Sequence, residues 1–240
     1  MTKKITYAVL AVLVIAPCAG LGWTLSSSLA GGAARLNEDT GNPEPTKTHY
    51  PFFATLGADF GPVGVTADFC RRHERSYFRP GPTLEAGVTA DYALIGGERW
   101  EVFGAAGFGF SRSPVGEAWL VGPAPTYDWT PIAAAGVRTG PFYKVDVAGS
   151  VDYRERQQIL YSMLEMSYGA VESPTITAAV AADYRAFERV ALGLQYRRVW
   201  YGPYEYRPGV SGEVRRTEGF TTAVESYMLF VLSVDLIRAP

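Results

Sequence analysis

Hydrophobic and polar residues alternate along most of the chain from about residue 52 onward. In the segment 82–94, Leu84 and Val88 fall on one side of an extended backbone, whereas Glu85 and Asp91 fall on the other. A period of two is the spacing of a half-buried β-strand. The same pattern predicts eight strands, at about 52–70, 82–94, 99–110, 128–139, 142–154, 174–185, 189–201 and 219–236.

The connections between these strands alternate in length. Short turns are expected at 95–98, 139–141 and 185–188, with longer connections between them. This alternation is typical of an all-β, closed, antiparallel up-and-down barrel.

Two segments leave alternatives open. The apolar parity of the first strand changes near Gly61-Pro62, which indicates a bulge or, alternatively, an extra tight hairpin. The segment 159–167 fits either an extension of the strands or a short helix.

The side on which the apolar residues face decides between two kinds of barrel. A lipocalin-like carrier turns them inward around an apolar ligand, and a transmembrane barrel turns them outward to lipid. The apolar faces end in aromatic residues, and Lys144 is the only lysine after Lys47, which favours the transmembrane barrel. The expected aromatic girdle consists of Trp100, Phe110, Tyr143, Tyr153, Tyr196 and Trp200.

The first residues have the pattern of a secretory signal peptide. Lys3 and Lys4 precede an apolar stretch, and small residues follow it. We expect a signal peptide over 1–30, with cleavage near Ala30, Ala34 or Gly20, and a membrane anchor as the alternative. A disordered leader over 31–50 and a barrel domain over 51–240 would follow.

In strand number and loop pattern the region 50–240 resembles the small eight-stranded outer-membrane barrels of the OmpA/OmpX-like group. The resemblance lies in architecture rather than in a diagnostic motif. It implies a location in the outer membrane of a Gram-negative bacterium, in contact with the lipid bilayer. It also implies insertion by the outer-membrane assembly machinery.

The net charge and the small numbers of cysteines and histidines argue against several classes of function. The net charge is −2 and no long basic run occurs, so a nucleic-acid partner is not expected. The chain holds two cysteines and two histidines, and we expect no disulfide scaffold, metal site or cofactor. Lipid-modifying barrel enzymes need a histidine base beside a serine. His49 would lie in the leader and His73 in the first long loop, so we expect no catalytic residues and no enzyme.

Charged residues on the polar faces gather near the short-turn ends of the strands. In a narrow lumen they are expected to form ion pairs that fill the interior. These residues are Asp91, Glu101, Arg138, Lys144, Asp146, Asp183, Arg189 and Asp235. The predicted function is therefore a structural or surface-contact role with a mostly plugged lumen, and a small passive channel is the alternative.

One long connection has a composition suited to contact. The segment 201–216 is rich in tyrosine and arginine. It fits either a partner-binding loop on the cell surface or an aromatic belt at the membrane interface.

Overall fold

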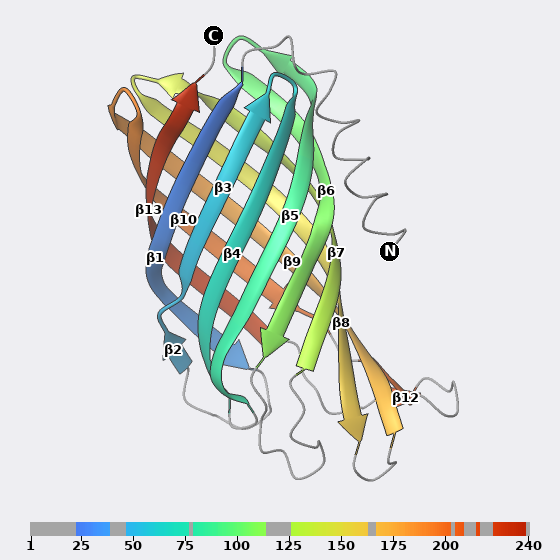
Figure 1. Ribbon diagram of the computed structural model, residues 1–240. Coiled ribbons are helices and arrows are strands. Elements are labelled where there is room, and N and C mark those ends of the chain that lie inside the picture. Colours follow the sequence, from blue (N-terminus) through green and yellow to red (C-terminus); the bar gives the residue numbers. More distant parts are fainter. Residues whose placement is uncertain are drawn as a thin grey trace.

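The alternating segments form long antiparallel strands that pair around a closed ring (Figure 1). The computed structural model describes residues 23–38, 47–76, 79–113, 126–162, 167–202, 205–208, 215–216 and 223–238. Within these residues ten strands build the barrel wall. They are β1 (Thr24–Glu38), β3 (Phe52–Phe60), β4 (Val63–Ser76), β5 (Arg79–Gly97), β6 (Trp100–Ser113), β7 (Thr126–Phe142), β8 (Val145–Ser162), β9 (Ser167–Phe187), β10 (Val190–Tyr201) and β13 (Ala223–Arg238).

Each wall strand pairs with the wall strands that precede and follow it in the sequence, so β10 lies between β9 and β13, and β13 pairs with β1 to close the ring. Three short strands add to this wall. They are β2 (Lys47–His49), which pairs with β1, β11 (Glu205–Pro208), which pairs with β9, and β12 (Arg215–Arg216), which pairs with β11.

The predicted fold class, an all-β closed antiparallel barrel, is confirmed, but the predicted number of eight strands is wrong. One added strand comes from Gly61-Pro62, where the hairpin alternative is right. Gly61 has a φ of 69°, and β3 and β4 pair from Phe60 and Val63 onward. The left-handed backbone at Gly61 suits glycine, and Pro62 needs no backbone donor there.

The other added strand is β1, and it changes the expected domain boundaries. Thr24–Glu38 pairs with β13 along its whole length, so the barrel begins at Thr24 and not at residue 51. The expected leader over 31–50 also contains β2. The small residues of β1 have a packing role: a Cβ at Gly32 would lie 1.9 Å from the carbonyl oxygen of Met228. They resemble the small-residue end of a signal peptide, which is why sequence reasoning assigned them to one.

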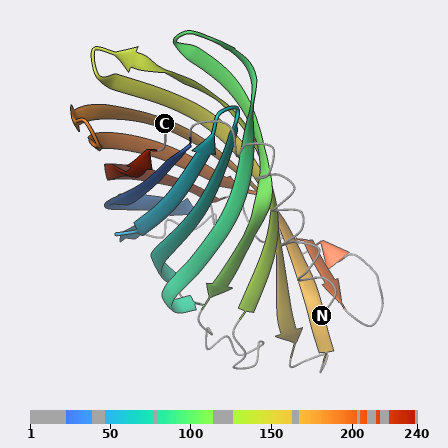
Figure 2. The same ribbon diagram turned by 45° about the horizontal axis from the view of Figure 1, so that its top comes forward.

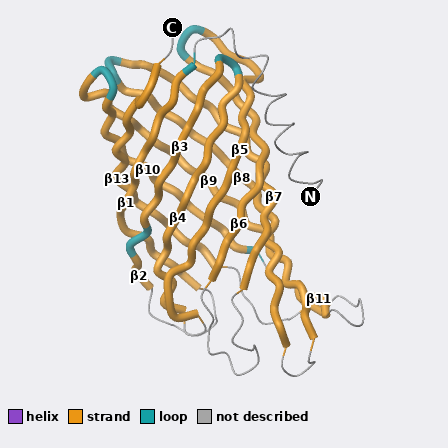
Figure 3. Tube along the Cα trace, viewed as in Figure 1, coloured by secondary structure: helices purple, strands orange, loops and turns teal. Residues whose placement is uncertain are grey.

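Four two-residue turns lie at one end of the barrel, which we call the short-turn end. They are formed by 61–62, 98–99, 143–144 and 188–189, and this end also holds the start of β1 and the end of β13. It is the upper end in Figure 1 and carries the teal turns in Figure 3. The longer connections belong to the opposite end, which we call the loop end.

Three turns lie further along the chain than predicted. The strand β7 continues through the expected turn at 139–141, with an irregularity between Thr139 and Phe142. The turn is then made by Tyr143 and Lys144, whose φ angles are 48° and 73°. Positive φ at both central residues is the mark of the tight turns that match strand twist.

The strands β8 and β9 project furthest at the loop end (Figures 1 and 2). Their pairing continues to Ser162 and Ser167, so residues 159–162 extend a strand as one of the two alternatives predicted. Among the described residues no helix is long and apolar enough to cross a membrane.

The strands turn their large apolar residues outward. Leu94, Phe108 and Phe230 are 61%, 64% and 70% exposed. Most inward positions of β5 and β6 carry small, polar or charged residues, such as Asp91 and Gly107. The apolar face of this barrel is therefore its outer surface.

Candidate functional site in the barrel lumen

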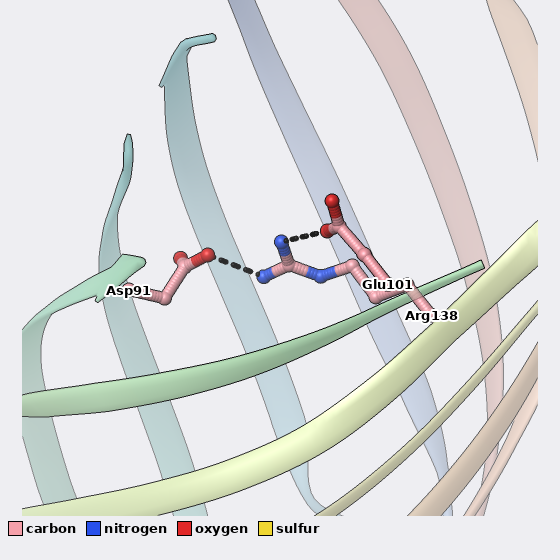
Figure 4. Close-up of polar contacts among 3 residues, drawn as sticks. All are labelled: Asp91, Glu101 and Arg138. Atoms are coloured by element: carbon pink, nitrogen blue, oxygen red, sulfur yellow. Dashed lines mark hydrogen bonds and ion pairs between the residues drawn. The ribbon is translucent and has the colours of Figure 1, made fainter. Parts of the chain in front are cut away.

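Arg138 joins two carboxylates at the short-turn end of the lumen (Figure 4). Its Nη2 donates to Oδ2 of Asp91 at 2.8 Å, and its Nη1 donates to Oε1 of Glu101 at 2.9 Å. Glu101 pairs with Arg138 across β6 and β7, and Asp91 comes from β5. The guanidinium also lies 4.1 Å from the ring centre of Phe103. Three of the predicted lumen charges thus form one network.

A second contact involves Asp146 and Asp183, which face each other across β8 and β9. The partner of Asp146 is Arg185, whose Nη2 lies 3.5 Å from Oδ2. Arg185 is not among the lumen charges predicted from the sequence. The Oδ1 atom of Asp183 is buried without a hydrogen-bond partner among the described residues. A Cβ at Gly193 would lie 1.8 Å from this atom, so a side chain there would displace the Asp183 carboxylate.

Two of the predicted lumen cations lie elsewhere. Lys144 and Arg189 occupy two-residue turns and are exposed, because the turns fall later in the chain than expected. Asp235 does face inward on β13, and its backbone N–H donates to the carbonyl oxygen of Arg189. Asp59 of β3, which sequence reasoning missed, faces the same end of the lumen.

The aromatic residues predicted as a girdle are placed on the outer surface with one exception. Tyr143 lies in a turn and is 99% exposed, so it stands beyond the strand on which it was expected. Outward positions are occupied by Trp100, Phe110, Tyr153, Tyr196 and Trp200; Trp100 and Trp200 lie at strand ends, whereas Tyr153 and Tyr196 lie in the middle of β8 and β10.

A polar cavity of about 450 Å³ opens beside the Arg138 network. Its wall is made mainly of small hydroxyl-bearing and glycine residues, together with Asp59, Glu101 and Arg138. The small residues are Ser26, Ser27, Ser28, Thr55, Gly57, Gly61, Thr66 and Ser233. Such a cavity can hold water or a small polar solute at the short-turn end.

Buried, mostly apolar side chains of β1, β10 and β13 cluster inside the barrel. Leu229 has no exposed surface, and it packs in one cluster with inward residues of β1, β10 and β13. We call this cluster the lumen plug; it consists of Ala30, Ala34, Val199, Tyr227 and Leu229, with Phe53 and Val231 packed against it. The guanidinium of Arg197 lies 4.7 Å from the ring centre of Phe53, and its Nε has no hydrogen-bond partner among the described residues.

His49 lies against the plug, and not in a solvated leader as expected. It is 9% exposed, and its Nε2 lies 2.9 Å from Oε1 of Glu225 without the alignment of a hydrogen bond. The hydroxyl of Tyr227 donates to Oε2 of Glu225, and the Tyr227 ring meets the His49 ring edge-on. His73, which was expected in a loop, lies within β4.

The described residues hold no group of three or more potential metal ligands from histidine, cysteine, aspartate or glutamate. Their titratable groups instead form pairs and small networks. Such pairs and networks can fill a lumen, bind water and link neighbouring strands of the barrel wall.

Comparison with known proteins gives only distant structural similarity. No family model matches the chain, and no curated protein matches its sequence. Neisserial surface protein A, NspA, has a TM-score of 0.45 and 10% identity, over 90% of this chain and 99% of that chain.

Two further solved structures are similar at a lower level. The attachment invasion locus protein Ail of Yersinia pestis has a TM-score of 0.39 and 13% identity, over 89% of this chain and 98% of that one. The outer membrane protein OprG from Pseudomonas aeruginosa has a TM-score of 0.38 and 10% identity, over 90% and 98%. These values are too low to support an argument, so the barrel assignment depends on the strand pairing.

Proposed function

We propose that this chain is an integral outer-membrane β-barrel protein of a Gram-negative bacterium, with a mostly closed lumen and a structural or surface-contact role. The observation that carries the proposal is the outward orientation of the large apolar side chains. Phe108, Val180 and Phe230 come from different strands, and more than half of each side chain is exposed on the outer face.

An apolar face of this extent is stable in lipid and a liability in water. Soluble monomers rarely expose contiguous apolar patches larger than a few hundred Å², because each costs about 25 cal/mol per Å² of contact with water. In a bilayer the same side chains meet hydrocarbon, and the closed ring leaves no strand edge unpaired. The signal-like N-terminus supports export to that membrane.

The orientation also argues against the lipocalin-like alternative. A carrier of an apolar ligand needs apolar residues around an internal cavity. The cavity in this barrel is lined by residues such as Ser26, Thr55 and Ser233, and most of the large aliphatic residues lie on the outer face.

Cell fractionation tests the proposal. We expect the protein in the outer-membrane fraction, resistant to alkaline carbonate extraction and soluble in detergent. On a gel, the detergent-solubilised barrel should migrate faster unboiled than boiled. Recovery as a soluble protein in the periplasm or the medium would overturn the proposal.

A small passive channel is the second candidate, and the polar cavity at the short-turn end favours it. The lumen plug supports closure, because Leu229 and Tyr227 fill the interior beyond that cavity. Planar-bilayer recording separates the two. We expect a conductance near zero for the closed barrel, whereas a large and steady conductance would favour the channel.

We also propose that the protein is not an enzyme and carries no cofactor. His49 is enclosed by Glu225 and Tyr227, which suits a structural role in the plug better than proton transfer to a substrate. The expected contacts are then the lipid bilayer, the assembly machinery during insertion, and a surface partner through the long connections. Half of the segment 201–216, proposed for such contact, lies outside the described residues.

A further inference from the structure

The polar cavity at the short-turn end has a wall of hydroxyl groups. Ser233 of β13, Ser28 of β1 and Thr55 of β3 are cross-strand neighbours on the inner face, and all three line the cavity. Because neighbouring strands lie about 4.8 Å apart, their hydroxyls form a row across three strands. None of these hydroxyls has a hydrogen-bond partner among the described residues. Each can therefore donate to a ligand and accept from it.

A second row of hydroxyls lies nearer the short-turn end. Ser26 and Thr66 flank Gly57 in the register of β1, β3 and β4, and all three residues line the cavity. A Cβ at Gly57 would lie 3.0 Å from the Oγ of Ser26, so a side chain there would crowd this hydroxyl. Glycine at this position leaves room between the two hydroxyls, and the cavity therefore offers donors and acceptors from four strands.

Carboxylates outnumber cations beside these hydroxyls. Asp59 is exposed, and its carboxylate makes no hydrogen bond or ion pair with another described residue. Arg138 already donates to Asp91 and to Oε1 of Glu101 (Figure 4), and Oε2 of Glu101 takes no part in this contact. The charges of Arg138, Asp91 and Glu101 all act on Asp59, so the four groups lie in one electrostatic environment. In their charged forms, three carboxylates and one guanidinium leave an excess of negative charge at the cavity.

We propose that this cavity binds a small polyhydroxylated amine, the class of molecule to which amino sugars belong. Asp59 and the second oxygen of Glu101 hold the ammonium group, and the ligand hydroxyls exchange hydrogen bonds with the two rows of serine and threonine. The cavity volume of about 450 Å³ lies within the range of small-molecule sites, and its polar wall suits a hydrophilic ligand.

The same groups argue against other ligands. The described residues hold no group of three or more histidine, cysteine, aspartate or glutamate side chains that could bind a metal ion. An anion would meet the excess of carboxylates, and Arg138 gives little compensation because Asp91 and Glu101 already accept from it. The inference goes beyond the proposed function and does not depend on it, because the cavity lies inside the barrel wall.

Calorimetry with matched ligands tests the inference. The folded protein in non-ionic detergent is titrated with glucosamine, glucose, glucuronate and cyclohexylamine, at a mildly acidic pH that keeps both amines protonated. The first three share a hydroxylated ring and differ in charge, whereas cyclohexylamine keeps a ring and the positive charge without the hydroxyls. We expect glucosamine to bind at least about fivefold more tightly than glucose or cyclohexylamine, and glucuronate to bind most weakly.

Variants assign the binding to the cavity. Asp59→Asn removes the carboxylate with little change in shape, and should lower the affinity for glucosamine about tenfold while changing the affinity for glucose less than about twofold. Thr55→Val removes one hydroxyl at nearly constant volume, and should weaken glucosamine and glucose by about two- to fivefold but not cyclohexylamine. Glu98→Gln is the matched control, since Glu98 is an exposed carboxylate in a turn at the same end and does not line the cavity. It should leave all affinities unchanged.

The comparisons among ligands need no variant, and heat-modifiability on a gel shows that each variant still forms the barrel. Absence of measurable glucosamine binding by the folded wild-type protein would overturn the inference. Equal affinities for glucosamine and glucose, or tighter binding of glucuronate, would overturn it because the carboxylates would not select the ligand. Equal affinities for glucosamine and cyclohexylamine would overturn the role of the hydroxyl rows. A folded Asp59→Asn variant with unchanged affinity for glucosamine would show that the amine binds elsewhere.

Discussion

Replacing Leu194 by arginine tests whether the outer face of the barrel lies in lipid. Leu194 projects outward from the middle of β10 and is about half exposed. It follows the turn residue Arg189 by five positions. At ~3.3 Å per residue and ~40° tilt this places it about 13 Å from the short-turn end, near the centre of a ~25 Å apolar band.

The expected cost follows from this depth. An arginine at the bilayer midplane costs about 2–4 kcal/mol, which lowers the folding equilibrium in lipid roughly 30- to 700-fold. Val147→Arg should cost less, because Val147 follows the turn residue Lys144 by three positions and lies nearer the interface. Ser150→Arg is the matched lumen-facing change, at a similar depth to Leu194. Its cross-strand neighbours Gly136 and Ala179 are small.

The assay is reversible folding into lipid vesicles, followed by urea titration of the heat-modifiable band. The predicted order of destabilisation is Leu194→Arg, then Val147→Arg, then Ser150→Arg. Equal midpoints for Leu194→Arg and Ser150→Arg would refute the outward assignment of the apolar face. A greater loss in Ser150→Arg would place the lipid on the other side of the wall.

Three further outcomes are expected. The mature protein should begin before Thr24, near Gly20, because cleavage after Ala30 would remove half of a strand paired with β13; N-terminal sequencing of the membrane-extracted protein checks this. Leu229→Ala should lower the unfolding free energy by about 2–5 kcal/mol and raise the planar-bilayer conductance above zero, and an unchanged conductance would mean that Leu229 does not close the lumen. Arg138→Ala should lower the unfolding free energy by about 1–3 kcal/mol, because Asp91 is left buried without its partner; a urea midpoint equal to that of the exposed-turn control Lys144→Ala would contradict this reason.

The long strands could be predicted because their apolar side is made of large residues. On β5 and β10 the outward positions are mostly leucine, valine, tyrosine and tryptophan, so the period of two stands out. At Gly61-Pro62 the alternation does not distinguish a bulge from a tight turn, because both change the side of the strand on which the apolar residues lie. The pairing of Phe60 with Val63 decides between them, and this pairing depends on the strands on either side.

The first strand could not be predicted from its own residues. Serine, glycine and alanine dominate Thr24–Ala34, a composition that also fits the end of a signal peptide. The reason for these residues lies about 200 positions further along the chain. Leu229 and Tyr227 of β13 fill the lumen beside Ala30 and Ala34, and the carbonyl of Met228 leaves no space for a side chain at Gly32.

The charged residues of the lumen show what the alternation of apolar and polar residues can predict about a site inside a barrel, and what it cannot. Parity places Asp91, Glu101 and Arg138 on the inner face correctly, because it depends only on the period of the strand. The height of each residue along the barrel depends on where the turns fall and how far neighbouring strands are staggered. Lys144 and Arg189 have the right charge, but turns that begin only a few residues later place both outside the lumen. Glu101 meets Arg138 as its direct cross-strand neighbour, whereas Asp91 meets it only through the stagger of β5 against β7. Face could therefore be predicted from the period of the sequence, but pairing required the register of the closed wall.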